Sequence, residues 1–165
     1  MLLAQMTGEL FMNNQKTLLI SLLVFIILGC NPQNKITEDQ AKSVLNSFFT
    51  ALNVKNYNCE ELGELVTDDF MIYEMEKTFT LNQFCEFVDG ARVNMKSTDW
   101  VLSDFTVSTD FNSVHIYYRN KGRFVSVDEE GQEIIINKEW LESVYIVRDN
   151  GVLKIKFLFS DDINQ

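Results

Sequence analysis

Four long segments in the second half of the chain are rich in β-branched and aromatic residues, and short turn sequences separate them. Such segments are typical of β-strands, and turns of the Asn150-Gly151 kind are typical of hairpins. The predicted strands cover residues 100–109, 113–127, 133–148 and 152–159. Because each strand leads directly into the next, this part of the chain is expected to form an antiparallel sheet.

The part of the chain before these strands has the spacing of helices. Apolar residues recur at three- and four-residue steps from Ala41 to Leu52, directly after a capping-box pattern at Thr37 and Gln40. A shorter helix is expected around residues 62–66, a strand and its tight return over 70–80, and a third helix over 81–93. Helices followed by a meander of strands predict an α+β domain over residues 37–160, with an acidic tail over 161–165.

An apolar block from Leu18 to Leu28 follows Lys16 near the start of the chain. A membrane-spanning helix needs about 20 apolar residues, whereas the core of a signal peptide needs roughly 7 to 15. The block is therefore too short to span a membrane and has the right length for export. A basic residue precedes the block only after Met12, so we expect translation to begin at Met12 rather than at Met1.

The apolar block ends at Ile27-Leu28-Gly29-Cys30, which resembles the lipobox of bacterial lipoproteins. The resemblance implies that residues 1–29 are removed as leader and signal peptide, that Cys30 carries acyl chains, and that residues 30–36 form a tether. A buried helix with an incidental cysteine is the alternative, but nothing amphipathic surrounds the block. The expected location is the periplasmic or cell-surface side of a bacterial membrane.

The formal net charge of −10 limits the partners of the domain. An acidic domain is repelled by nucleic-acid phosphates and by anionic lipids, so nucleic acid is excluded and membrane contact is expected only through the acyl chains. Once Cys30 is lipidated, Cys59 and Cys85 remain. Export permits a disulfide between them, and two free buried cysteines are the alternative.

The stretch FFTALNVKNYNCEELGELVTDDFMIYE, Phe48 to Glu74, resembles the opening of the nuclear transport factor 2-like superfamily. This superfamily includes SnoaL-like cyclases and ketosteroid isomerase, and the resemblance covers about residues 37–160. It implies a curved antiparallel sheet, packed on three N-terminal helices, that forms a cone with a central cavity. Members range from enzymes to binders and dimerisation modules, so the resemblance indicates the fold and leaves the function open.

The pairing of the strands decides which side chains line such a cavity. With a two-residue turn at Asn150-Gly151, Glu142 pairs with Phe159 and lies on the apolar inner face. In the preceding hairpin, a two-residue turn at Glu130-Gly131 directs one set of side chains inward, namely His115, Tyr117 and Arg119. A three-residue loop directs the other set inward, namely Val114, Ile116 and Tyr118. Both alternatives remain open.

Three side chains are candidate acids or bases: Glu74, His115 and Glu142. Their non-catalytic alternatives are a surface histidine for His115, and for Glu142 with Arg119 either the polar anchor of a pocket or an ion pair at its rim. The resemblance places Glu74 where ketosteroid isomerase has its carboxylate base, but Phe48 where it has its oxyanion-binding tyrosine. Isomerase chemistry of that type would therefore lack its donor. The predicted cavity-lining residues are Phe48, Tyr73, Trp100, Tyr117, Arg119, Trp140, Phe157 and Phe159.

The motifs of several enzyme classes are missing from the sequence, namely GxSxG, HExxH, CxxC, the P-loop and GxGxxG. One histidine cannot build a multi-histidine metal site, so neither a metal nor a cofactor is expected. We therefore expect a non-catalytic domain that binds a small or hydrophobic ligand, or a protein partner. The alternatives are an isomerase, dehydratase or cyclase that uses one of the candidate acids, and a structural module that forms homodimers.

Overall fold

The computed structural model describes residues 34–163, so the expected leader, the lipobox and Cys30 lie outside the described residues. The described part contains three helices and six strands. The helices are α2 (Glu38–Ala51), α3 (Cys59–Leu65) and α4 (Leu81–Ala91). The strands are β1 (Val66–Glu74), β2 (Lys77–Thr80), β3 (Met95–Thr109), β4 (Ser113–Val127), β5 (Glu133–Asp149) and β6 (Val152–Asp162). None of these helices is long and apolar enough to cross a membrane.

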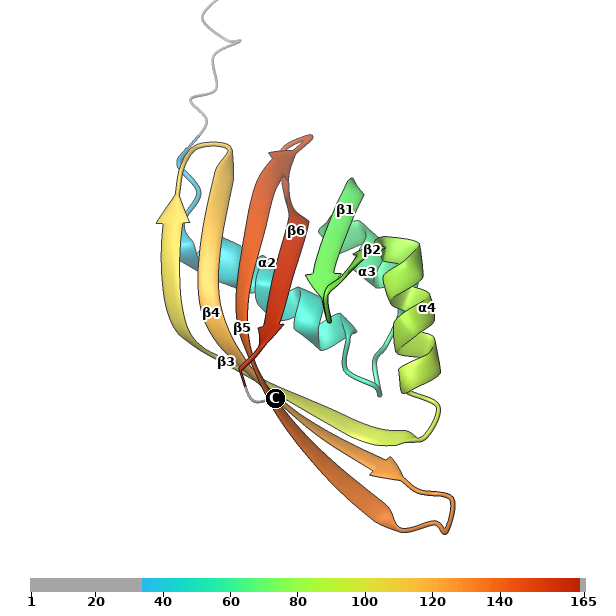
Figure 1. Ribbon diagram of the computed structural model, residues 1–165. Helices are drawn as coiled ribbons and strands as arrows, with labels where there is room; N and C mark the ends of the chain where they lie inside the picture. The colour runs from blue at the N-terminus through green and yellow to red at the C-terminus, as the bar shows by residue number, and fades with distance from the viewer. Residues whose placement is uncertain (1–33, 164–165) are drawn as a thin grey trace, which may run out of the picture. The chain divides into compact units, whose positions relative to one another are not determined.

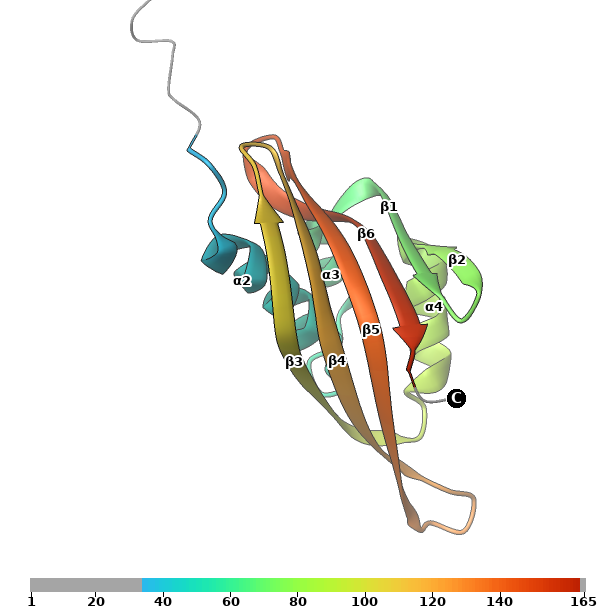
Figure 2. The ribbon, with the colours of Figure 1, turned by 60° about the vertical axis from the view of Figure 1, so that its left-hand side comes forward.

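The six strands form one curved sheet in the order β2-β1-β6-β5-β4-β3, and the three helices lie against the same face of it (Figures 1 and 2). This confirms the predicted α+β class. The expectation of a wholly antiparallel sheet is wrong, because β1 and β6 pair in parallel. The hairpins from β3 to β6 end with β6 beside β1, and the two strands then run in the same direction.

Side-chain caps fix where the three described helices begin: Asn58 caps α3, and capping boxes start α2 and α4. The Gln40 backbone N–H donates to the Thr37 hydroxyl (3.2 Å), and the Thr37 backbone N–H donates to the Gln40 side chain (3.0 Å). This confirms the predicted capping box. Thr80 and Gln83 form a second capping box at the start of α4. Each box satisfies backbone donors that the first turn of a helix leaves without partners.

The described domain is longer at both ends than the sequence indicates. Ile36 was expected in the tether, but it is buried in the core, and its backbone N–H donates to the carbonyl of Asp110 (3.0 Å). At the other end, β6 runs to Asp162, so Asp161 and Asp162 belong to the sheet and not to an acidic tail. The buried side chain of Ile36 extends the fold before the first helix. The strand pairing of β6 extends it beyond the last aromatic residue of the strand, Phe159.

The β4–β5 hairpin has the longer of the two loops that were considered. The Asp128 backbone N–H donates to the carbonyl of Gln132 (3.0 Å) around the loop Glu129–Gly131, and Gly131 has a φ of 83°. This left-handed conformation suits glycine at the end of a three-residue hairpin loop. The two-residue alternative is therefore wrong. Val114, Ile116 and Tyr118 face the core, whereas His115, Tyr117 and Arg119 lie exposed on the outer face of the sheet.

The β5–β6 hairpin starts in the predicted register and then departs from it. Asp149 pairs with Val152 around Asn150-Gly151, and Ile146 pairs with Ile155, but the register shifts before Tyr145 pairs with Phe157. A β-bulge of this kind inserts one extra residue and reverses which side chains face inward. As a result Glu142 pairs with Ser160 rather than with Phe159.

A disulfide joins Cys59, at the start of α3, to Cys85 in α4, with their Cα atoms 5.9 Å apart. Of the two alternatives left open by the sequence, the bonded pair is the one that the structure contains. The bond connects two helices that lie on either side of β1 and β2 in the sequence, and so it holds the helical layer together.

Candidate functional site

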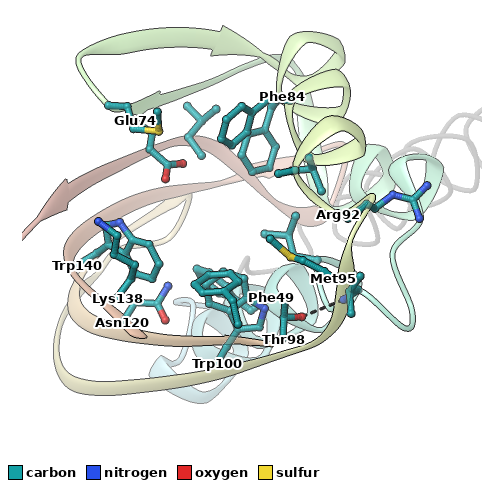
Figure 3. A pocket seen from close by; sticks show the side chains of 18 of the residues that line it. Phe49, Glu74, Phe84, Arg92, Met95, Thr98, Trp100, Asn120, Lys138 and Trp140 are labelled. Carbon is teal, nitrogen blue, oxygen red and sulfur yellow. Dashed lines mark hydrogen bonds between the residues drawn. The ribbon is translucent and has the colours of Figure 1, made fainter. Parts of the chain in front are cut away.

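A cavity of about 320 Å³ lies between the inner face of the sheet and helices α2 and α4. Its walls are mostly apolar, and all strands except β2 contribute to them. Figure 3 shows side chains of α2, α4 and the sheet converging on this space, among them Phe49, Phe84 and Trp100. An apolar hollow with a few polar groups is the usual construction of a small-molecule site.

Three aromatic rings, Trp100, Phe124 and Trp140, form one wall of the cavity, which we call the aromatic wall. The Trp100 ring centroid lies 5.2 Å from that of Phe124 and 6.0 Å from that of Trp140. Gly122 makes this packing possible, because a Cβ atom at this position would lie 2.8 Å from both the Phe124 and the Trp140 rings. A side chain there would therefore displace the rings.

Glu142 is the most deeply buried ionisable group of the cavity, with 4% of its surface exposed. Its Oε1 atom accepts hydrogen bonds from Asn120 Nδ2 (3.2 Å) and Ser160 Oγ (3.1 Å), whereas Oε2 has no partner among the described residues. Burial, with a smaller contribution from the charge of Glu74, raises the pKa of Glu142 to about 7 against the lowering effect of its hydrogen-bonding neighbours.

The Tyr118 hydroxyl belongs to the same buried group of side chains. A hydrogen bond with the Tyr118 hydroxyl lowers the pKa of Glu142, although its geometry is poorer than that of the bonds from Asn120 and Ser160. Burial, followed by the nearby Glu142, raises the pKa of Tyr118 well above its usual value. Tyr118 is therefore a neutral hydroxyl throughout the physiological range.

Four buried polar atoms on cavity-lining side chains have no hydrogen-bond partner among residues 34–163. They are Trp100 Nε1, Asn120 Oδ1, Glu142 Oε2 and Asp162 Oδ1. Leaving a buried donor or acceptor without a partner costs about 1–3 kcal/mol, so native proteins rarely do so without a reason. All four atoms belong to side chains that line one apolar space, although each atom itself has almost no accessible surface.

Glu74, at the end of β1, lies across the cavity from Asn120, Lys138 and Trp140, and its carboxyl group points inward (Figure 3). Burial, and then the charge of Asp162, raise the pKa of Glu74. Asp162 itself is paired with Lys138, whose Nζ atom lies 2.8 Å from Asp162 Oδ2. The cavity thus brings together three carboxyl groups and one paired lysine.

The structure brings together some of the residues proposed from the sequence. Phe48, Trp100 and Trp140 line the cavity, and so do the candidate acids Glu74 and Glu142. Arg119 was expected beside Glu142, but it lies on the outer face and its Nη1 atom contacts Glu139 (2.8 Å). The proposed pairing of Glu142 with Arg119 is therefore absent.

The other predicted residues lie away from the cavity. His115 is on the outer face, with its ring centroid 4.5 Å from that of Tyr145, so it does not reach the candidate acids. The hairpin loop length places His115, Tyr117 and Arg119 outside, and the bulge in β6 does the same for Phe157 and Phe159. Tyr73 is also exposed; with Phe159 it borders a second hollow, which shares Glu74 and Trp140 with the cavity.

Several polar residues of the cavity were not found from the sequence, among them Asn120, Lys138 and Asp162. Asn120 follows Tyr118 by two positions, so choosing the three-residue loop would have placed it inward as well. Asp162 was interpreted as solvated charge because it follows the last aromatic residue of β6 and precedes the end of the chain. Within the described residues, no three His, Cys, Asp or Glu side chains are arranged to hold a metal ion.

No protein-family model matches the sequence, and no curated protein matches it. Solved structures do match. A nuclear transport factor 2-like protein from Cytophaga hutchinsonii is 15% identical, with a TM-score of 0.62 over 78% of this chain and 100% of that one. A type 2 hexachlorocyclohexane dehydrochlorinase is 12% identical, with a TM-score of 0.59 over 75% of this chain and 86% of that one. The association domain of C. elegans CaMKII is 13% identical, with a TM-score of 0.57 over 75% and 94%.

These similarities show that the domain has the nuclear transport factor 2-like fold, as the resemblance in residues 48–74 implied. At such low identity they define the fold alone. The fold carries enzymes as well as association domains, so the function has to be argued from the cavity.

Proposed function

We propose that this is a binding domain for a small, mainly apolar ligand, which the cavity holds through hydrogen bonds to Glu142, Asn120 and Trp100. The observation that carries the proposal is the set of buried, unpartnered polar atoms on the walls of an apolar cavity. An occupant that pairs with them would recover the free energy that their burial costs. A purely structural module would instead have filled this space with its own aromatic side chains.

Glu142 supports a second candidate function, acid–base catalysis on a bound compound. A carboxyl group with a pKa of about 7 can both accept and donate a proton at neutral pH. One neighbour in fold is a dehydrochlorinase. We prefer binding because His115, one of the three candidate acids or bases, lies outside the cavity. Conversion of a bound compound into a product, rather than its retention, would favour the enzyme.

Native mass spectrometry of the gently purified full chain tests the binding proposal. We expect a retained small-molecule mass on the wild-type protein and its loss from Gly122→Ala, because the added Cβ would displace the aromatic wall. Gly90→Ala is the matched control, since a Cβ there meets nothing within 4 Å and should leave the adduct in place. A ligand-free wild type, together with failure of every apolar probe to bind, would contradict the proposal.

We also propose that Cys30 anchors the domain to a bacterial membrane, so that the ligand is bound outside the cytoplasm. The support is the lipobox-like sequence Ile27-Leu28-Gly29-Cys30. In cells fed a labelled fatty acid, the wild-type chain should incorporate the label and Cys30→Ser should not. Ser21→Ala, in the apolar block, is expected to keep it. Continued labelling of Cys30→Ser would show that this cysteine is not the acylation site.

The outer face of the sheet is where we propose that two copies of the chain meet. Tyr73, Tyr117 and Phe159 are 41–47% exposed on this face, and exposed aromatic side chains on one face are typical of interaction surfaces. The similarity to an association domain agrees with this proposal. The same native mass spectra would report the mass of a monomer or of a dimer.

A further inference from the structure

We propose that the ligand is a hydrophobic amine, bound as its ammonium ion between the carboxyl groups of Glu74 and Glu142 and against the aromatic wall. This inference rests on the proposed function, because it names the chemical class of the ligand that the cavity holds. Four features of the cavity support it: its charges, its unpaired acceptors, its aromatic wall and its size.

The charges in the cavity leave two carboxyl groups without a cation. Lys138 is paired with Asp162 at 2.8 Å. Arg92 points away from the cavity and is paired with Asp89 at 2.8 Å (Figure 3). Among residues 34–163, no ion pair includes Glu74 or Glu142. A bound cation would form ion pairs with Glu74 and Glu142, whereas a bound anion would be repelled by both carboxylates.

The unpaired hydrogen-bonding atoms favour a ligand rich in donors. Three of the four are acceptors when the carboxyl groups are ionised, namely Asn120 Oδ1, Glu142 Oε2 and Asp162 Oδ1, and Trp100 Nε1 is a donor. The Tyr118 hydroxyl, beside Glu142, is a further donor, so the excess of acceptors rests on Asn120 and Asp162. Asn120 and Glu142 are almost completely buried, so a bound ligand has to displace neighbouring side chains to reach them. An ammonium group offers up to three N–H donors and no acceptor, which matches the excess of acceptors. A carboxylate ligand would add acceptors where donors are needed.

The aromatic wall gives the cation a further favourable surface. Trp100, Phe124 and Trp140 all line the cavity, and tryptophan is the aromatic side chain that attracts cations most strongly. The Trp100 and Trp140 rings lie in the same part of the cavity as Asn120 (Figure 3). The opposite wall, formed by Phe84 and Phe87 of α4, is apolar and would hold the hydrocarbon part of the ligand. A volume of about 320 Å³ accommodates an amine with one aromatic ring or a short alkyl chain.

A matched set of three probes on one carbon skeleton tests the inference: 4-phenylbutylamine, 4-phenylbutanol and 4-phenylbutyrate. Their binding would be measured calorimetrically on the full chain in zwitterionic lipid nanodiscs, with empty nanodiscs as the blank. We expect the amine to bind about tenfold or more tightly than the alcohol, because a charge-assisted hydrogen bond is stronger than a neutral one. The carboxylate should bind most weakly.

Two charge-neutralising variants assign the effect to the proposed residues. Glu142→Gln and Glu74→Gln should each reduce amine binding by about tenfold and leave alcohol binding within about twofold. Glu133→Gln is the control, because Glu133 lies on the same strand as Glu142 but pairs with Lys96 on the surface. The control removes the same charge without touching the cavity.

The outcomes separate the inference from the proposed function. Equal or tighter binding of the alcohol, or amine binding that both variants retain in full, would overturn the amine assignment while binding in the cavity stands. A retained natural ligand without a basic nitrogen would do the same. If none of the three probes binds and the purified protein is ligand-free, both the assignment and the proposed function fail.

Discussion

Replacing Glu142 by glutamine is expected to stabilise the protein at pH 8 and to leave its stability almost unchanged near pH 4.5. In the folded protein the pKa of Glu142 is about 7, whereas a glutamate in the unfolded chain titrates near 4.3. Between these values the folded state holds a proton that the unfolded state has released, so the free energy of unfolding falls as the pH rises. The total loss for this one group is roughly 4 kcal/mol, and it is nearly complete about one pH unit above the folded-state pKa.

Glutamine at position 142 avoids this loss, because the amide carries no charge and keeps an oxygen for Asn120 and Ser160. Two titratable neighbours, Tyr118 and Glu74, could also change the pH dependence of the stability. Tyr118 stays neutral, while the pKa of Glu74 is also raised and leaves a smaller slope of the same sign.

Urea unfolding of both proteins at intervals from pH 4.5 to 9 measures the difference. Glu139→Gln, on the same strand and paired with Arg119 on the outer face, is the control and should not change the slope. A variant that is less stable than the wild type at pH 8 would contradict the account of Glu142 as a buried carboxyl without a cation.

Removing the disulfide should have a similarly large effect. We expect the double variant Cys59→Ala/Cys85→Ala to lose about 2–4 kcal/mol of stability, mainly because the unfolded chain is no longer constrained by a crosslink. The two cysteines are 26 residues apart in the sequence, a loop length at which the entropic contribution is substantial. Guanidinium unfolding of the oxidised wild type and of the variant gives the difference directly.

Reduction of the wild-type protein separates the crosslink from the packing of the two side chains. Reduced wild type keeps both sulfur atoms and should lose most of the same free energy, while the double variant should not respond to a reductant. A reduced wild type that unfolds at the same denaturant concentration as the oxidised protein would show that the bond does not stabilise the fold. A structural disulfide also fits the proposed location outside the cytoplasm.

Local patterns in the sequence were sufficient to predict the elements of the fold. The Thr37–Gln40 capping box is set by residues three positions apart, and the turn at Asn150-Gly151 depends on two adjacent residues with positive φ values of 48° and 87°. Alternation along β5 alone also placed Glu142 on the inner face, because Val144 and Ile146 share its side of the strand.

Some residues were predicted on the wrong face of the sheet because loop length and β-bulges decide the register. The alternation of apolar and polar residues along a strand does not contain that information. A change of one residue in the β4–β5 loop exchanges His115, Tyr117 and Arg119 on the inner face for Val114, Ile116 and Tyr118. The second set is the more hydrophobic and is the one that the structure buries, but alternation by itself does not fix the length of the loop. The bulge after Ile155 is a local departure from the ladder, and it moved Phe157 and Phe159 outward.

The grouping of polar residues in the cavity could not be predicted from single strands either. Glu74, Asn120 and Asp162 come from three different strands, and only the parallel pairing of β1 with β6 brings Glu74 close to Asp162. The sequence contains the residues, but their proximity is a product of the topology. A search for known catalytic motifs could not show that the carboxyl groups of Glu74, Glu142 and Asp162 share one apolar cavity, because such motifs lie within one segment of the chain.

Crystals of the natively purified protein would test the central claim most directly. Our account predicts electron density for a small molecule in the cavity, with a donor atom within hydrogen-bond distance of Glu142 Oε2 or Asn120 Oδ1 and its apolar part against Phe84. The account would be contradicted by a closed core. In such a core Trp100 and Trp140 fill the cavity, and Glu142 Oε2 and Asn120 Oδ1 accept hydrogen bonds from donors of the protein itself.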